Sequence, residues 1–128
     1  MTRFIRILVV DDDPSIIKLL GANLKARDFD VVTAEDGESG FRAIEQTLPD
    51  LVVLDYMMPK MTGLDVVKQV RGMGNNVPII ILTARCTASE KEILIEHGVD
   101  DYMTKPFIIE DMMKRIHKVL DRKSKVHT

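Results

Sequence analysis

Several polar side chains of this sequence follow directly after largely apolar segments, where they could meet and hold a charged ligand. The segments are 7–10, 51–54, 79–82 and 102–104, and the groups that follow them are the carboxylates of Asp11, Asp12 and Asp55, the hydroxyl of Thr83 and the amine of Lys105. If the segments are parallel strands, their carboxyl ends meet at one edge, where ligands of open α/β sheets bind. Such a set of groups suits a hard cation and a phosphoryl group.

The three carboxylates would need a cation between them. In one pocket, Asp11, Asp12 and Asp55 would repel each other and raise at least one pKa, and a divalent cation would remove that conflict. Because no Cys or His lies near them in the sequence, we expect oxygen ligation, which predicts Mg²⁺ or else Mn²⁺. Asp55 is then the candidate nucleophile for a phosphoryl group. Lys105 would neutralise charge on that group, and Thr83 would donate its hydroxyl to it.

Each of these residues also has an ordinary structural interpretation. The acids at 11–13 could all be turn or cap residues, and we expect this of Asp13, which precedes a proline in the pattern of a helix N-cap. Taken singly, Asp55 or Thr83 could serve a turn, and Lys105 could be a solvated surface residue. The joint placement of compatible groups after four separate segments favours the functional interpretation.

The elements that must position these groups alternate between strand and helix along the whole chain. Apolar runs predict strands at 5–10, 30–34, 51–55, 77–82 and 101–104, and periodic apolar positions predict helices from 14, across 41–48, at 63–71, at 87–97 and at 109–121. This order predicts an α/β fold, a (βα)5 doubly wound three-layer sandwich around a parallel sheet of order 2-1-3-4-5. The third and fourth strands lack polar alternation, as expected of strands covered on both faces.

Two local patterns give sharper expectations about helix ends. Phe41, Ile44 and Leu48 should share the buried stripe of the second helix, which ends before Pro49. Gly98 should take a left-handed conformation that ends the fourth helix.

The length of the chain predicts one domain, and its charge is not the basic charge typical of proteins that bind nucleic acid. The chain has 128 residues, a formal net charge of −2 and one cysteine, Cys86. No apolar segment approaches the about 18 residues of a membrane span, and the absence of a basic balance argues against direct binding of nucleic acid. A single cysteine, expected to be a small and partly buried residue, excludes an internal disulfide. It fits a reducing compartment, so a cytoplasmic location is expected.

Four motifs together resemble one protein family. The segments ILVVDDD (7–13), LVVLDYMMPKMTG (51–63), IIILTA (79–84) and GVDDYMTKPF (98–107) are similar to the receiver (CheY-like) domain of two-component response regulators, over nearly the whole chain. The resemblance implies that residues 1–122 form a signalling domain rather than an enzyme, followed by a tail or linker at 123–128. It implies that Asp55 accepts a phosphoryl group from a sensor histidine kinase or a phosphotransfer protein. GVDDY is similar to the subgroup with winged-helix DNA-binding output.

The resemblance also implies a ligand set for the metal. Asp12 would ligate Mg²⁺ directly and Asp11 partly through water, while Asp55 and the backbone carbonyl of Met57 would complete the protein ligands.

A switch is implied by the same resemblance. Lys105 would contact the phosphoryl group and precede a cis Pro106, while Thr83 would move to the phosphate as the ring of Tyr102 turned inward. The surface of the fourth helix, fifth strand and fifth helix would then contact an output domain, a separate effector or a second copy of the chain. Charges available there are Glu96, Asp100, Asp101, Lys114 and Arg115, and a solvated rim explains them equally well.

Two positions lie where comparison with the family suggests that dephosphorylation is tuned, at Met57 and Arg85. An apolar Met57 cannot orient an attacking water by hydrogen bonding, so we expect a long-lived phosphorylated form. Two alternatives come from other functional classes. A haloacid-dehalogenase-type phosphatase would need a second acid at position 57, and the intact site residues argue against a phosphorylation-independent interaction domain on the same fold.

Overall fold

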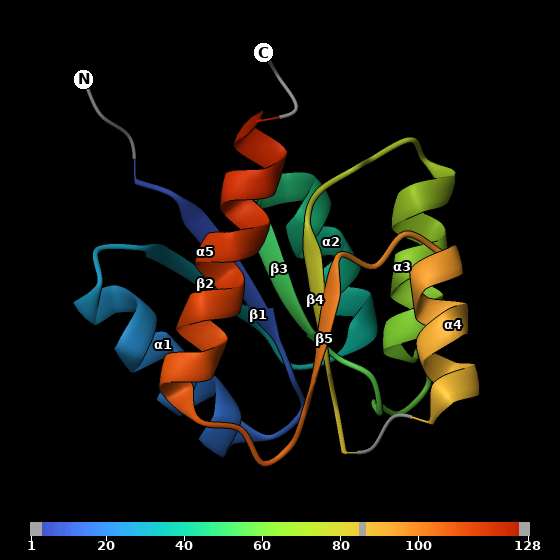
Figure 1. The fold of residues 1–128 in the computed structure, drawn as a ribbon, viewed down its shortest axis with the longest axis horizontal. Helices are drawn as coiled ribbons and strands as arrows, with labels where there is room; N and C mark the ends of the chain where they lie inside the picture. The colour runs from blue at the N-terminus through green and yellow to red at the C-terminus, as the bar shows by residue number, and fades with distance from the viewer. Residues whose placement is uncertain (1–3, 85–86, 126–128) are drawn as a thin grey trace.

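A five-stranded parallel sheet lies between two layers of helices (Figure 1). The computed structural model describes residues 4–84 and 87–125, so Arg85 and Cys86 lie outside the described residues. In chain order the elements are β1 (Arg6–Val10), α1 (Pro14–Ala26), β2 (Asp30–Ala34), α2 (Gly37–Thr47), β3 (Leu51–Asp55), α3 (Gly63–Gly72), β4 (Ile79–Thr83), α4 (Ala88–Glu96), β5 (Asp101–Thr104) and α5 (Ile109–Lys125). The strand order is β2-β1-β3-β4-β5, which confirms the predicted fold class and topology.

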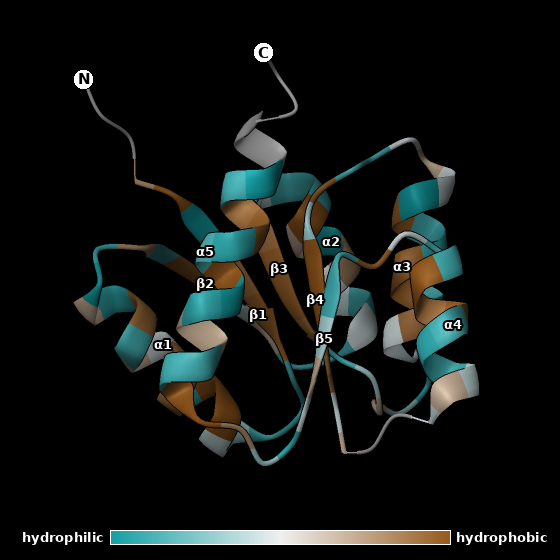
Figure 2. Ribbon diagram, in the orientation of Figure 1, coloured by the Kyte–Doolittle hydropathy of each residue, from teal (hydrophilic) through white to brown (hydrophobic). Residues whose placement is uncertain are grey.

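The core consists of two apolar layers, one on each face of the sheet. Helices α1 and α5 cover one face, and α2, α3 and α4 cover the other (Figure 1). Because successive strand residues point to opposite faces, Val53 packs toward α1 and α5 while Leu54 packs toward α2 and α3. Every residue of β3 and β4 is buried, which explains their lack of polar alternation. The central strands are accordingly hydrophobic along their length (Figure 2).

The parallel register brings the carboxyl ends of the strands to one edge of the sheet, at the bottom of Figure 1. Val10 is paired with both Ala34 and Leu54, and Asp55 is paired with Leu82. The residues immediately after β1 and at the ends of β3 and β4 therefore lie side by side.

Helix ends agree with the capping residues in the sequence. The Asp13 side chain accepts a hydrogen bond from Ser15 N, 2.9 Å away, which confirms its predicted role as the N-cap of α1. Gly98 has φ +87°, which confirms the left-handed residue after α4. No helix within the described residues is long and apolar enough to cross a membrane.

Three details differ from the sequence-based expectations. Leu48 is 71% exposed, so its predicted place in the buried stripe of α2 is wrong: it follows the last helical residue in a left-handed conformation and no longer keeps the helical periodicity. Strand β4 begins at Ile79, two residues later than predicted, after Pro78, which has no N–H to donate to a ladder. Helix α5 extends four residues beyond the predicted end, to Lys125.

Candidate functional site

Three carboxylates converge at the carboxyl edge of the sheet. Asp11 follows β1, Asp12 is next to it, and Asp55 is the last residue of β3. Each offers a carboxylate oxygen within 4.8 Å of those of the other two. Asp11 is 1% exposed and Asp55 3% exposed, whereas Asp12 is exposed. The structure thus brings the three predicted acids together, with two of them buried in the sheet edge and the third open to solvent.

Among the described residues, Lys105 is the cation that contacts these acids. Its Nζ lies 3.0 Å from Asp11 Oδ2 and 3.3 Å from Asp55 Oδ1. Its backbone is held beside the end of β4, because Lys105 N donates to the carbonyl of Thr83 (2.7 Å). The Lys105–Pro106 peptide bond is cis, as predicted. Among the described residues, one ammonium therefore contacts two of the three clustered carboxylates.

The electrostatics of the site follow from this imbalance. Burial, and then repulsion from Asp11, raise the pKa of Asp55 to about 7, although Lys105 opposes the rise. Burial by itself would lower the pKa of the Lys105 ammonium, but its contacts with Asp11 and Asp55 outweigh this and raise its pKa. The described residues of the site thus carry more acidic than basic side chains at the sheet edge.

The donor set fits a hard divalent cation. All candidate side-chain donors are carboxylate oxygens, the type that Mg²⁺ prefers. Asp11 Oδ1 accepts a hydrogen bond from Asp13 N (2.9 Å). Asp11 Oδ2 is buried, and among the described residues the ammonium of Lys105, 3.0 Å away, is its one close polar partner. A buried anionic oxygen in this situation is a ready metal ligand.

The predicted switch residues lie on adjacent strands beside the acids. Thr83 is 3% exposed at the end of β4, while Tyr102 of β5 is partly buried and packs against the apolar layer that includes α4. Met57, two residues beyond Asp55, is 64% exposed.

Gly63 belongs to the site region, although sequence reasoning gave it no role. Its N–H donates to the carbonyl of Tyr56 (2.9 Å), and a Cβ built at Gly63 would lie 2.6 Å from the carbonyl oxygen of Asp55. Only glycine lets the first residue of α3 approach the backbone of Asp55 this closely. The signal in the sequence was a glycine directly after the N-cap Thr62.

One of the charges expected on the surface of α4, β5 and α5 is not available there. Asp100 has a side chain only 13% exposed, accepts from Ile79 N at 2.8 Å and pairs with Arg71 at 3.3 Å, so the expectation for it is wrong. Asp101 and Arg115 pair with each other at 2.9 Å. Glu96 and Lys114 are exposed.

The strand order and the cluster of acids with Lys105 at the carboxyl edge of the sheet are those of a receiver domain. Comparisons with known proteins agree. The family model of the response regulator receiver domain matches residues 7–117, and the chain belongs to this family. This membership favours a signalling domain over the phosphatase considered from the sequence.

The relatives and solved structures support the same family. The chain is 45% identical over 117 residues to the alkaline phosphatase synthesis transcriptional regulatory protein PhoP of Bacillus subtilis, covering 91% of this chain and 49% of PhoP. It is 42% identical over 118 residues to the response regulator MprA of Mycobacterium tuberculosis, covering 92% of this chain and 51% of MprA. It superimposes on a CheY-like receiver domain of Methanospirillum hungatei with a TM-score of 0.91 and 25% identity, covering 96% of this chain and 98% of that one. The chain spans about half the length of the curated relatives it matches.

Proposed function

We propose that Asp55 of this receiver domain accepts a phosphoryl group from a phosphohistidine of a sensor histidine kinase or a phosphotransfer protein. A carboxylate oxygen of Asp55 forms a bond to phosphorus, the nitrogen–phosphorus bond of the donor breaks, and the donor imidazole keeps the electron pair. The observation that carries this proposal is the convergence of Asp11, Asp12 and Asp55 with Lys105 at one sheet edge.

The acids would hold Mg²⁺, or Mn²⁺, together with the backbone carbonyl of Met57. The buried Asp11 Oδ2 supports this assignment. When bound, the ion supplies positive charge that offsets repulsion between a carboxylate and an incoming phosphoryl group. Lys105, already in contact with Asp11 and Asp55, would turn from Asp55 to a phosphoryl oxygen and hold it in line.

The phosphoryl group would then act as a switch. It adds about −1.5 to −2 charge and strong acceptor oxygens. Thr83, which is buried at the end of the strand beside β3, would donate its hydroxyl to one of those oxygens, and Tyr102 would turn inward toward it. The phosphoryl group would shift an existing two-state equilibrium, and a change from 1:99 to 99:1 needs about 5.5 kcal/mol of differential stabilisation.

The readout surface would be α4, β5 and α5, which would contact an output domain, a separate effector or a second copy of the chain. The relative named as a transcriptional regulatory protein is about twice as long as the region matched, which supports an output domain joined through a linker that begins at 123–128. In this account the domain at 1–122 acts in the cytoplasm as a signalling switch, and its only catalysis is its own phosphorylation and dephosphorylation.

Intact mass measured after incubation with acetyl phosphate and Mg²⁺ tests the proposal. We expect an increment of one phosphoryl group, which should be absent in Asp55→Asn and in the presence of EDTA. No increment in the parent protein would overturn the proposal.

A further inference from the structure

Helix α4 is attached to the sheet by few side chains. Leu94 is its one buried residue, and its neighbours Ile93 and Ile95 are 40% and 57% exposed. Helix α5 is attached to the sheet more firmly, because it buries Met112, Met113, Ile116 and Val119 in the apolar layer of the other face. Any second contact between α4 and β5 therefore has a large share in fixing where α4 lies.

Tyr102 is the β5 side chain beneath α4, and it shares a face of the sheet with Thr83. On β5, Met103 packs toward α5 and Tyr102 toward α4. On β4, Ile81 is paired with Tyr102 and packs on the same side, so Thr83, two residues further on, points to that side as well. A ring that turned toward Thr83 would leave its present partners under α4.

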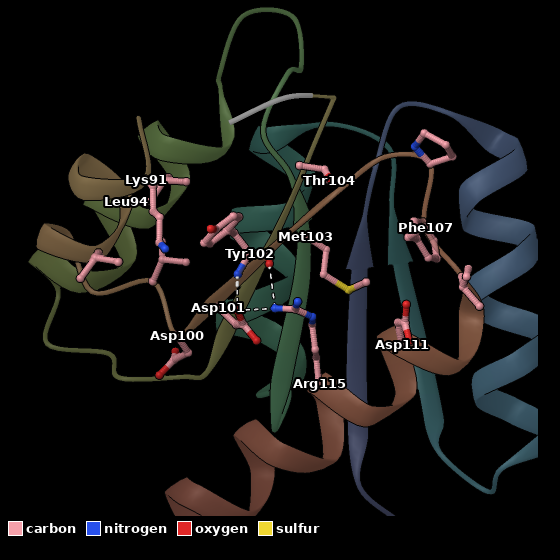
Figure 3. A pocket seen from close by; sticks show the side chains of 14 residues that line it. Lys91, Leu94, Asp100, Asp101, Tyr102, Met103, Thr104, Phe107, Asp111 and Arg115 are labelled. Atoms are coloured by element: carbon pink, nitrogen blue, oxygen red, sulfur yellow. Dashed lines mark hydrogen bonds and ion pairs between the residues drawn. The ribbon is translucent and has the colours of Figure 1, made fainter. Parts of the chain in front are cut away.

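Lys91 of α4 is such a partner. Its Nζ lies 5.3 Å from the centre of the Tyr102 ring, within the range of a cation–π contact. Both side chains line a groove of about 550 Å³ between α4, β5 and α5 (Figure 3). Lys91 forms no ion pair with any other described residue, so the ring is the specific partner of this charge.

We propose that Lys91 is a positioning residue that holds the Tyr102 ring in its partly exposed place and thereby restrains the switch. The inference rests on the proposed function, because it concerns the conformer that the phosphoryl group would favour. Removing the Lys91 charge lowers the cost of turning the ring inward. By reciprocity, a phosphoryl mimic that favours the inward ring then binds more tightly.

Calorimetric titration with beryllofluoride, a non-covalent phosphoryl mimic, in the presence of Mg²⁺ tests this at equilibrium. Lys91→Met keeps the length of the side chain and removes the charge, and Lys91→Arg keeps the charge. We expect Lys91→Met to tighten beryllofluoride binding about two- to fivefold, the effect of one cation–π contact at an exposed site. Lys91→Arg should bind like the parent, and in a Tyr102→Leu background Lys91→Met should change nothing.

An unchanged affinity in Lys91→Met, or the same tightening with and without the Tyr102 ring, would overturn the inference. A parent protein that binds no beryllofluoride would instead count against the proposed function. In that case urea unfolding of the parent, Lys91→Met, Tyr102→Leu and the double variant decides the inference without phosphoryl chemistry. A two- to fivefold coupling between Lys91 and Tyr102 in the unfolding equilibrium constant is expected, and additive effects would refute the contact.

Discussion

At the scale of single residues, the described part of the site has more acidic than basic side chains, and two of the acids are buried. Asp11 and Asp55 are almost fully buried, and among the described residues Lys105 is the one ammonium in contact with both. The pKa of Asp55 rises to about 7, so burial and then repulsion from Asp11 disfavour its carboxylate in the free protein. A bound cation would offset this cost. This imbalance makes the stability of the fold depend on pH and on metal.

The first consequence is that replacing Asp55 by a neutral residue should stabilise the fold by an amount that depends on pH. Its pKa is about 7 in the fold against 3.8 as the ordinary value, so between these values only the folded state keeps the proton, and stability falls as pH rises through that window. In EDTA, Asp55→Asn should therefore raise the free energy of unfolding at about pH 8 by about 1–3 kcal/mol, and the gain should fade toward pH 4. Urea denaturation at several pH values measures this, and a gain of equal size at both ends would show that the Asp55 charge is not its cause.

The second consequence is stabilisation by Mg²⁺. At a concentration 100 times its dissociation constant the ion should add about 2.7 kcal/mol to the free energy of unfolding. Asp12→Asn should weaken this effect, because Asp12 offers one of the three clustered carboxylates. Asp13→Asn is the matched control, since it changes the adjacent acid, which caps α1, to another good N-cap. Thermal unfolding with titrated Mg²⁺ distinguishes them, and equal losses in both variants would contradict the proposed ligand set.

Met57 gives a prediction about the lifetime of the phosphorylated form. Met57 is 64% exposed, and its thioether is a poor hydrogen-bond partner for an attacking water, whereas an amide there could orient one. Met57→Asn should speed loss of the phosphoryl group about two- to tenfold, the worth of one net hydrogen bond. Loss of mass over time after removal of acetyl phosphate measures the rate. Met73→Asn, at a comparably exposed position (60%) after α3, should leave it unchanged, and slower loss in Met57→Asn would refute the idea.

At the scale of elements, the pattern of apolar residues predicted where the strands lie. It did not predict individual contacts between elements. β2, β3 and β5 begin and end where predicted. For β3 the reason is that an unbroken apolar run records burial on both faces of the sheet. Leu48 escaped prediction because its left-handed backbone depends on how α2 meets β3. The role of Asp100 also escaped, because its partners Arg71 and Ile79 come from α3 and β4. The site acids could be predicted because they lie at or just after strand ends. The role of Gly63 could not, because it depends on the lack of a Cβ beside the Asp55 backbone.

Gly63 supports a prediction about how α3 meets the site. A Cβ at this position would lie 2.6 Å from the Asp55 carbonyl oxygen, so Gly63→Ala must push α3 away from β3. We expect a loss of about 1–3 kcal/mol in the free energy of unfolding and slower phosphorylation by acetyl phosphate. Gly72→Ala, at the other end of the same helix with nothing within 4 Å of its Cβ, should be neutral or slightly stabilising. Equal stability of the two variants in urea would contradict the close approach.

At the scale of the whole molecule, topology explains why residues from distant parts of the chain form one site. The order β2-β1-β3-β4-β5 places β1 beside β3 and β3 beside β4, so 11–12, 55 and 83 become neighbours although the sequence separates them widely. Lys105 joins them from beyond β5. The other edge of the sheet is held by ion pairs such as Arg71–Asp100. The proposed chemistry thus lies at the carboxyl edge of the sheet, and helix packing against β5 would carry the signal to a partner.

The central claim is that Asp55, alone among the clustered acids, forms the acyl phosphate. Sodium borohydride reduces an acyl phosphate to an alcohol and so converts a phosphorylated aspartate to homoserine. Peptide mass mapping after treatment with acetyl phosphate, Mg²⁺ and borohydride should find homoserine at position 55 only, and none when EDTA is present. Homoserine at position 11 or 12, or phosphate on a hydroxyl side chain with position 55 unchanged, would contradict the account.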